Sequence, residues 1–206
     1  MKPKEILIRD KAQFQKCWDF IEQAFYTNRR LPDQVFRENF TGFFFDDNAR
    51  FLDIFLGVQK SALNTNEQLI TLMLFKYSRL EGHYQWDDYY PAFQLSINTP
   101  PEDFFGIFSF EAPLGDSIRY ADITVCVPES LEWAIWQSYD LELCIIGFNK
   151  EKGADKIPSN KNWFPVNNHW VTIEKAITDI MPPMYCHSGG KVPDDIAEKL
   201  RTNYGT

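Results

Sequence analysis

The sequence predicts an α+β fold in which a mostly antiparallel sheet, formed by the central region, carries helices from both ends of the chain. Two observations predict it. First, apolar residues recur at helical spacing near both termini. Second, the central region contains segments typical of strands, in which apolar residues either alternate with polar ones or form short continuous runs. A run of strands flanked by helices is typical of α+β proteins. The length of 206 residues suits a single globular domain, 1–206.

The first element is a helix expected over 11–26. Asp10, followed by Gln13, resembles the capping arrangement that begins many helices. The residues of its apolar face are Phe14, Cys17, Trp18, Ile21, Ala24 and Phe25. The sequence Arg-Arg-Leu-Pro at 29–32 marks the exit from this helix.

The next region, 39–78, allows more than one interpretation. Three consecutive phenylalanines at 43–45 indicate a buried strand. The apolar residues after Asp46 and Asp47 fit either a helix through Ala62 or a second strand over 50–56. The segment 67–78 fits either a buried strand or a short helix.

The central region is rich in predicted strands. Alternation predicts one that contains Phe93 to Ile97 and ends before Pro100 and Pro101. Further strands are expected over 104–111, 118–127 and 141–148. Pro128 is well placed in the first turn of a helix, so we expect a short helix from Pro128 through Trp136. The polar segment 151–162 is expected to be a loop, and helices are expected over 170–180 and 194–203.

The charge of the chain is concentrated in one region. The formal net charge is −8. Residues 81–150 hold 12 acidic residues against Arg119 and Lys150, a balance of −10, whereas 1–80 and 151–206 sum to +2 and zero. A negative field of this kind disfavours nucleic acid and anionic membranes as partners and favours a basic protein. The alternative is that the acidic residues only keep a Phe-rich protein soluble.

The segment 83–90, with the sequence HYQWDDYY, is the predicted recognition site. Aromatic rings supply buried area at interfaces, and neighbouring carboxylates pair with Arg or Lys. The predicted partner-binding residues are Trp86, Asp87, Asp88, Tyr89 and Tyr90, extended by Glu102 and Asp103. The alternative is a loop whose aromatic rings pack back onto the sheet.

The sequence contains no established catalytic motif, so no catalytic residue, metal ligand or cofactor is assigned. The string Cys186–His187–Ser188–Gly189–Gly190 has the residue types of a nucleophile and an oxyanion site. Neighbouring side chains on an extended segment point to opposite faces, however, which favours a surface loop. Adjacent acidic residues are typical of turns and of helix N-termini. A small hydrolase that uses dispersed carboxylates, or Cys186 with a histidine, remains the alternative function.

The expected location is the cytoplasm. The N-terminal sequence MKPKEILIRD has no apolar stretch of the kind found in signal peptides, and no apolar run is long enough to span a membrane. The four cysteines are widely spaced and are expected to be reduced thiols. Cys126 and Cys144 lie in apolar runs and are expected in the core.

One stretch resembles a known class of proteins. Residues 122–135, with the sequence DITVCVPESLEWAI, and more broadly 118–148, resemble small bacterial immunity proteins of contact-dependent and polymorphic toxin systems. This resemblance implies a non-enzymatic cytoplasmic inhibitor that binds one cognate toxin, and many such toxins are basic nucleases. The function we expect is therefore neutralisation of a basic toxin by occlusion of its active surface. A homo-oligomeric structural protein is a third alternative.

Overall fold

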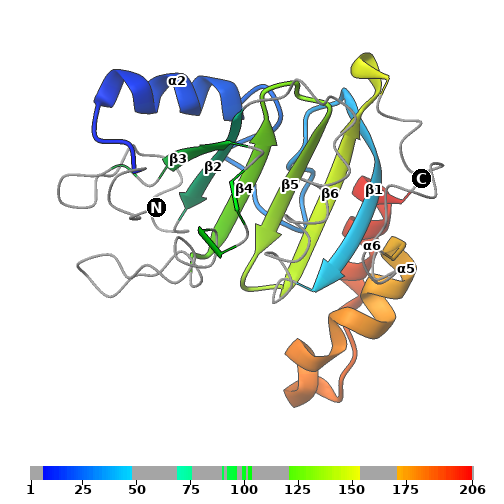
Figure 1. The fold of residues 1–206 in the computed structure, drawn as a ribbon. Helices are drawn as coiled ribbons and strands as arrows, with labels where there is room; N and C mark the ends of the chain where they lie inside the picture. Colours follow the sequence, from blue (N-terminus) through cyan, green and yellow to red (C-terminus); the bar gives the residue numbers. More distant parts are fainter. Residues whose placement is uncertain are drawn as a thin grey trace.

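A computed structural model describes residues 7–47, 69–75, 90, 92–96, 99–100, 102–103, 121–153 and 171–205. Its helices and strands, in chain order, are α2 (Lys11–Ile21), β1 (Phe40–Asp47), β2 (Leu69–Phe75), β3 (Ala92–Ser96), β4 (Ile123–Pro128), β5 (Trp133–Ser138), β6 (Leu143–Asn149), η4 (Lys150–Lys152), α5 (Ile173–Lys175), η6 (Ala176–Ile180), η7 (Pro182–Ser188) and α6 (Asp194–Tyr204). Figure 1 shows one twisted sheet with α2 near the β3 side and α5 and α6 near the β1 side. This arrangement confirms the predicted α+β class with helices from both ends of the chain.

The sheet has six strands in the order β1-β6-β5-β4-β2-β3, and every neighbouring pair is antiparallel. The segment 67–78, which fitted a strand or a helix, contains strand β2. The strand expected over 104–111, the helix or hairpin expected over 50–62 and most of the loop expected over 151–162 lie outside the described residues.

The segment from Pro128 to Trp136 is not a helix, contrary to the prediction. A turn after Pro128 closes with a 3.0 Å bond from the Leu131 N–H to the Pro128 carbonyl, and strand β5 follows. All six residues of β5 are buried. Because Trp133 and Ile135 face one side of the sheet while Ala134 and Trp136 face the other, the segment follows the period of a strand with two covered faces. The expected strand–helix–strand unit is therefore an antiparallel meander of β4, β5 and β6.

Helix α2 begins as predicted and ends earlier. The Asp10 carboxylate accepts a 2.7 Å hydrogen bond from the Gln13 N–H, which confirms the cap. The helix ends at Ile21 rather than near Tyr26 because the chain there turns into extended structure. Phe25 forms an antiparallel bridge with Phe36, and the Tyr26 N–H donates to the Val35 carbonyl at 2.7 Å.

The core between the helices and the sheet is largely aromatic. Phe25 meets Trp136 edge-on at 5.3 Å between ring centroids, and Phe36 lies 5.0 Å from Phe43. Gly147 in β6 makes room for these rings, since an added Cβ would lie 2.8 Å from the Cε1 atom of Phe43. One continuous cluster joins α2, the sheet and the C-terminal helices.

The C-terminal segment packs against β1. Val171 bridges to Phe45, and α5 and the π-helical η6 together cover most of the helix expected over 170–180. Helix α6 confirms the closing helix expected over 194–203. Exposed Arg201 joins α6 to α5 through two hydrogen bonds to the Glu174 carboxylate, at 2.8 and 3.0 Å.

The opposite face of the sheet is also buried. Cys126, Ile135 and Ile146 lie side by side on β4, β5 and β6 with no solvent exposure. The prediction that Cys126 and Cys144 belong to the core is confirmed, because both are fully buried. Among the helices that the structure describes, none has the length and apolar character needed to cross a membrane.

Candidate functional site

The aromatic and acidic segment expected to bind a partner is described at one residue only. Trp86, Asp87, Asp88 and Tyr89 lie outside the described residues. Tyr90 is buried at 7% exposure, and its ring stacks on Phe14 of α2 with 4.5 Å between centroids. Tyr90 therefore occupies the core, because its position just before β3 directs the ring under α2, and it is not an exposed anchor.

Glu102 and Asp103 follow the end of β3. The Asp103 N–H donates to the Pro100 carbonyl at 3.0 Å, which forms a turn. Glu102 is exposed and Asp103 is half-buried. Ser96 pairs with Leu69, and Ile70 pairs with Pro128, so this end of the sheet also carries the β4–β5 turn with Glu129 and Glu132.

A second acidic group lies at the opposite end of the sheet. Asp122 immediately precedes β4, and Asp140 and Glu142 lie in the turn between β5 and β6. Strand β1 ends beside this turn, because Asp47 pairs with Leu143. The described acidic residues of the central region therefore divide between the two ends of the sheet and do not form one continuous patch.

The turn between β5 and β6 presents an aromatic ring next to carboxylates. Tyr139 is 45% exposed and is the one large apolar side chain that is exposed among the described residues. Asp140 and Glu142 beside it are exposed as well. The Tyr139 N–H donates to the Asp122 carbonyl at 2.8 Å, and the Glu142 N–H donates to the Tyr139 carbonyl at 3.0 Å. These bonds hold the ring and the acidic residues on a defined turn.

Sequence reasoning missed this turn. The sequence predicts a helix over 128–136, whereas the structure has strand β5 there, paired with β6 as a hairpin. Because the hairpin was not predicted, the sequence SYDLE at 138–142 was not recognised as the turn that joins its two strands. The available signal was a short polar break between two apolar runs of strand length. The combination of a ring and carboxylates is nevertheless the one predicted for 83–90, at another position in the same acidic region.

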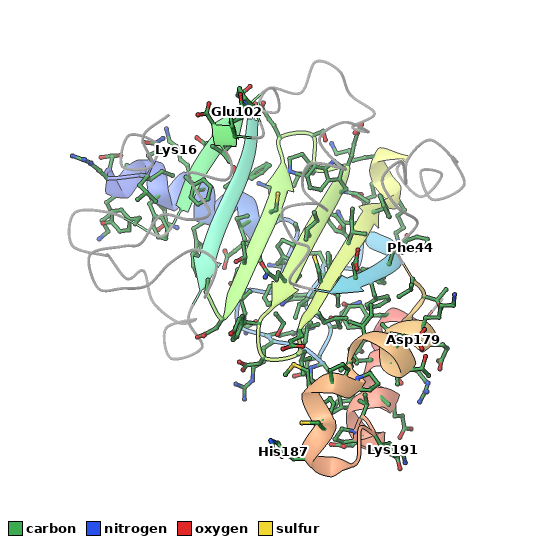
Figure 2. The ribbon with its side chains drawn as sticks, turned by 60° about the horizontal axis from the view of Figure 1, so that its bottom comes forward. Lys16, Phe44, Glu102, Asp179, His187 and Lys191 are labelled. Carbon is green, nitrogen blue, oxygen red and sulfur yellow. The ribbon has the colours of Figure 1, made fainter. Side chains whose placement is uncertain are left out.

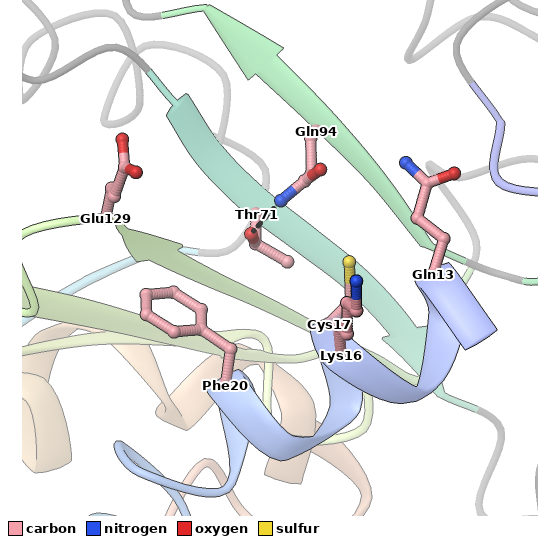
Figure 3. Close-up of a pocket in the computed structure, with 7 residues that line it drawn as sticks. All are labelled: Gln13, Lys16, Cys17, Phe20, Thr71, Gln94 and Glu129. Atoms are coloured by element: carbon pink, nitrogen blue, oxygen red, sulfur yellow. Dashed lines mark hydrogen bonds between the residues drawn. The ribbon is translucent and has the colours of Figure 1, made fainter.

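A pocket lies between α2 and the sheet. Its volume is about 260 Å³. Gln13, Lys16, Cys17 and Phe20 line it from the helix, while Thr71, Gln94 and Glu129 line it from β2, β3 and the β4–β5 turn (Figure 3). Burial raises the pKa of the Cys17 thiol to about 11. This thiol therefore stays protonated near neutral pH, and thiolate chemistry has no place in the pocket.

Cys186 and His187 lie on the outside of η7. Both are exposed, and Gly189 caps the segment in a left-handed conformation. Figure 2 shows His187 at the opposite side of the molecule from Glu102. A surface location agrees with the interpretation of this string as an ordinary loop, although its backbone is helical rather than extended.

The acidic pairs do not form a metal site in the described ranges. No group of three or more His, Cys, Asp or Glu side chains there could hold a metal ion. Asp194 and Asp195 occupy the first turn of α6, where acidic residues interact favourably with the helix dipole, and Asp194 pairs with Lys191 at 2.7 Å. Their role in the structure is therefore explained without catalysis.

Comparison with known proteins does not indicate a function for this chain. No family model matches the chain, and neither the curated proteins nor the solved structures gave a match.

Proposed function

We propose that this chain is a binding protein that captures a basic protein through carboxylates at the turn between β5 and β6. In the cell, this role would be that of a cytoplasmic immunity-type protein that neutralises a toxin. The observation that carries the proposal is Tyr139, which is exposed on a hydrogen-bonded turn that also carries the exposed residues Asp140 and Glu142.

The mechanism is occlusion of a cationic surface. Carboxylates at the β5–β6 turn pair with Lys or Arg side chains that a nuclease toxin needs for phosphate contacts, and the Tyr139 ring supplies apolar contact area. The β5–β6 turn joins two strands in which every residue is buried. The loss of conformational entropy on binding is therefore smaller for this turn than for a mobile loop. Opposite charges also accelerate encounter.

Two further features support a binding role. The excess of acidic residues is confined to the region 81–150, which supplies this turn. Burial keeps the Cys17 thiol of the pocket neutral, and Cys186 with His187 lies on an exposed surface away from Glu102. Among the described residues, neither the Cys17 pocket nor the surface at Cys186 and His187 therefore supports the hydrolase alternative.

Affinity capture with matched variants tests the proposal. The wild-type chain, the variant Tyr139→Ala/Asp140→Asn/Glu142→Gln and the control Glu198→Gln are immobilised and exposed to lysate of the source organism at low and high salt. We expect one basic protein to be retained by the wild type and the control, and lost by the triple variant and at high salt.

A second measurement links binding to neutralisation. The captured protein is expressed alone and together with each variant. We expect the wild type and Glu198→Gln to relieve its toxicity and the triple variant to fail. A partner retained equally by the triple variant, or a captured protein without toxicity, contradicts the proposal. The homo-oligomer alternative is tested by the mass from light scattering.

A further inference from the structure

The pocket beneath α2 has a polar floor where an apolar one would be expected. Thr71 of β2 pairs in register with Val127 of β4 on one side and with Gln94 of β3 on the other. Val127 belongs to the apolar core that α2 covers, and Thr71 faces the same side of the sheet at only 3% exposure. Burial of polar groups costs free energy unless they find hydrogen-bond partners. A threonine and a glutamine at these positions therefore require an explanation.

The hydrogen bonds of this floor are incomplete. The Gln94 Nε2 atom lies 3.4 Å from the Thr71 Oγ1 atom, and this long contact is the only hydrogen bond of either side chain within the described ranges. It leaves the Thr71 hydroxyl proton and the Gln94 carbonyl oxygen available. Figure 3 shows the two side chains turned toward each other at the strand side of the pocket. One donor and one acceptor thus remain for a bound molecule.

Charges of opposite sign stand at the mouth of the same pocket. Lys16 comes from α2 and Glu129 from the β4–β5 turn, and both side chains are exposed. Neither forms an ion pair with any residue that the structure describes. In Figure 3, Gln13 and Glu129 lie at opposite sides of the pocket, and Lys16 lies on α2 between these two sides. An ammonium and a carboxylate at separate points of one cavity match a ligand that carries both charges.

We propose that this pocket binds a small zwitterion of the amino-acid class. Its carboxylate contacts Lys16, and its ammonium group contacts Glu129. The polar end of its side chain contacts Thr71 and Gln94, and the Phe20 ring covers its apolar part. The volume of about 260 Å³ lies below the range of roughly 300–1,000 Å³ that is typical of sites for drug-sized ligands. A free amino acid fits within this volume.

The proposal is separate from the capture of a basic protein. The pocket lies on the side of β3, β2 and α2, whereas Tyr139 lies on the turn between β5 and β6 at the other end of the strands. The two sites share no residue. A variant at one site should therefore leave binding at the other site unchanged, and the failure of one proposal does not imply the failure of the other.

Calorimetric titration of the full chain with each of the common amino acids tests the proposal. Each amino acid that binds is compared with its N-acetyl derivative, which lacks the ammonium group, and with its carboxamide, which lacks the carboxylate. We expect at least one amino acid to bind at millimolar or lower concentration. Both derivatives should bind at least about tenfold more weakly, the loss expected when one paired charge is removed.

Matched variants locate the binding site. Lys16→Met and Glu129→Gln change exposed side chains, so the fold should persist, and each should weaken binding by about tenfold or more. Thr71→Val should also weaken binding, with its folding checked by circular dichroism. Lys11→Met on the same helix and Glu142→Gln on the distant turn should have no effect.

Three results would overturn the proposal. The first is the absence of binding by every amino acid in the panel. The second is equal binding of the N-acetyl derivative, which would show a simple anion site at Lys16. The third is unchanged affinity in folded Lys16→Met and Glu129→Gln.

Discussion

The hydroxyl of Tyr204, in the last turn of α6, accepts a 3.0 Å hydrogen bond from the backbone N–H of Val35 in the connection between α2 and β1. The same hydroxyl donates to the Asp33 carbonyl at 2.6 Å. Tyr204 is 2% exposed, and burial raises its pKa far above the ordinary value. The phenol therefore stays neutral and links α6 to the connection between α2 and β1.

Replacement of Tyr204 by phenylalanine tests this link. The variant keeps the ring, whose centroid lies 5.1 Å from that of Phe43, and removes both hydrogen bonds. The buried Val35 N–H then loses its acceptor, so we expect the free energy of unfolding to fall by about 1–3 kcal/mol. Urea denaturation measures it. Tyr185→Phe, at a half-buried ring without a described hydrogen bond, is the control and should change stability little.

The rings that pack over Gly147 lead to a second prediction. Gly147→Ala places a methyl group 2.8 Å from Phe43 and 3.0 Å from Phe36, closer than carbon atoms normally approach. We expect a loss of about 1–3 kcal/mol from overpacking. In a double-mutant cycle, Phe43→Leu should recover part of this loss because the smaller side chain makes room. Strictly additive effects would show that the ring does not limit position 147.

The exposed pair of Glu174 and Arg201 predicts a dependence on pH. The hydrogen bond from Arg201 lowers the pKa of the Glu174 carboxyl. A lowered pKa in the folded state means that the pair stabilises the fold above the ordinary pKa of the carboxyl and loses this effect as pH falls through the lowered value. Both side chains are about half exposed, at 47% and 59%, so the effect should be small and sensitive to salt.

Glu174→Gln measures this contribution. We expect it to reduce the denaturation midpoint slightly near neutral pH and to match the wild type in acid, where the native carboxyl is protonated. Glu151→Gln, on η4 and in no described ion pair, should not reproduce this pattern. A difference between Glu174→Gln and the wild type that persists in acid would contradict the ion-pair explanation.

The four thiols should differ in reactivity. Cys17, Cys126 and Cys144 are buried and Cys186 is exposed. A thiol reagent should therefore label one cysteine rapidly in the native protein, and Cys186→Ser should abolish this labelling. The remaining three should react only at the rate at which the protein unfolds. Rapid labelling of a second thiol would show that a buried face opens without global unfolding.

The candidate site at the β5–β6 turn was not among the residues predicted from the sequence, and the recognition site predicted at 83–90 stays a prediction. The pattern of rings beside carboxylates in an acidic region could be recognised in the sequence, and Tyr139 with Asp140 and Glu142 fits that pattern. Their position could not be derived, because a proline after an apolar run predicts the start of a helix, whereas Pro128 is the last residue of β4. The pocket was not foreseen at all, since Lys16, Thr71 and Glu129 are far apart in the chain and meet only after β2, β4 and α2 have packed together.

By itself, the sequence determined the class of fold, the start of α2, the closing helix α6 and the burial of Cys126 and Cys144, because these depend on local periodicity, capping and apolar runs. The tertiary structure decided that β5 is a strand, that Tyr90 lies in the core and that the acidic residues divide between the two ends of the sheet. These outcomes depend on strand pairing and on which face a neighbouring element covers. Contacts between residues that are distant in the chain determine both, and the local pattern does not contain them.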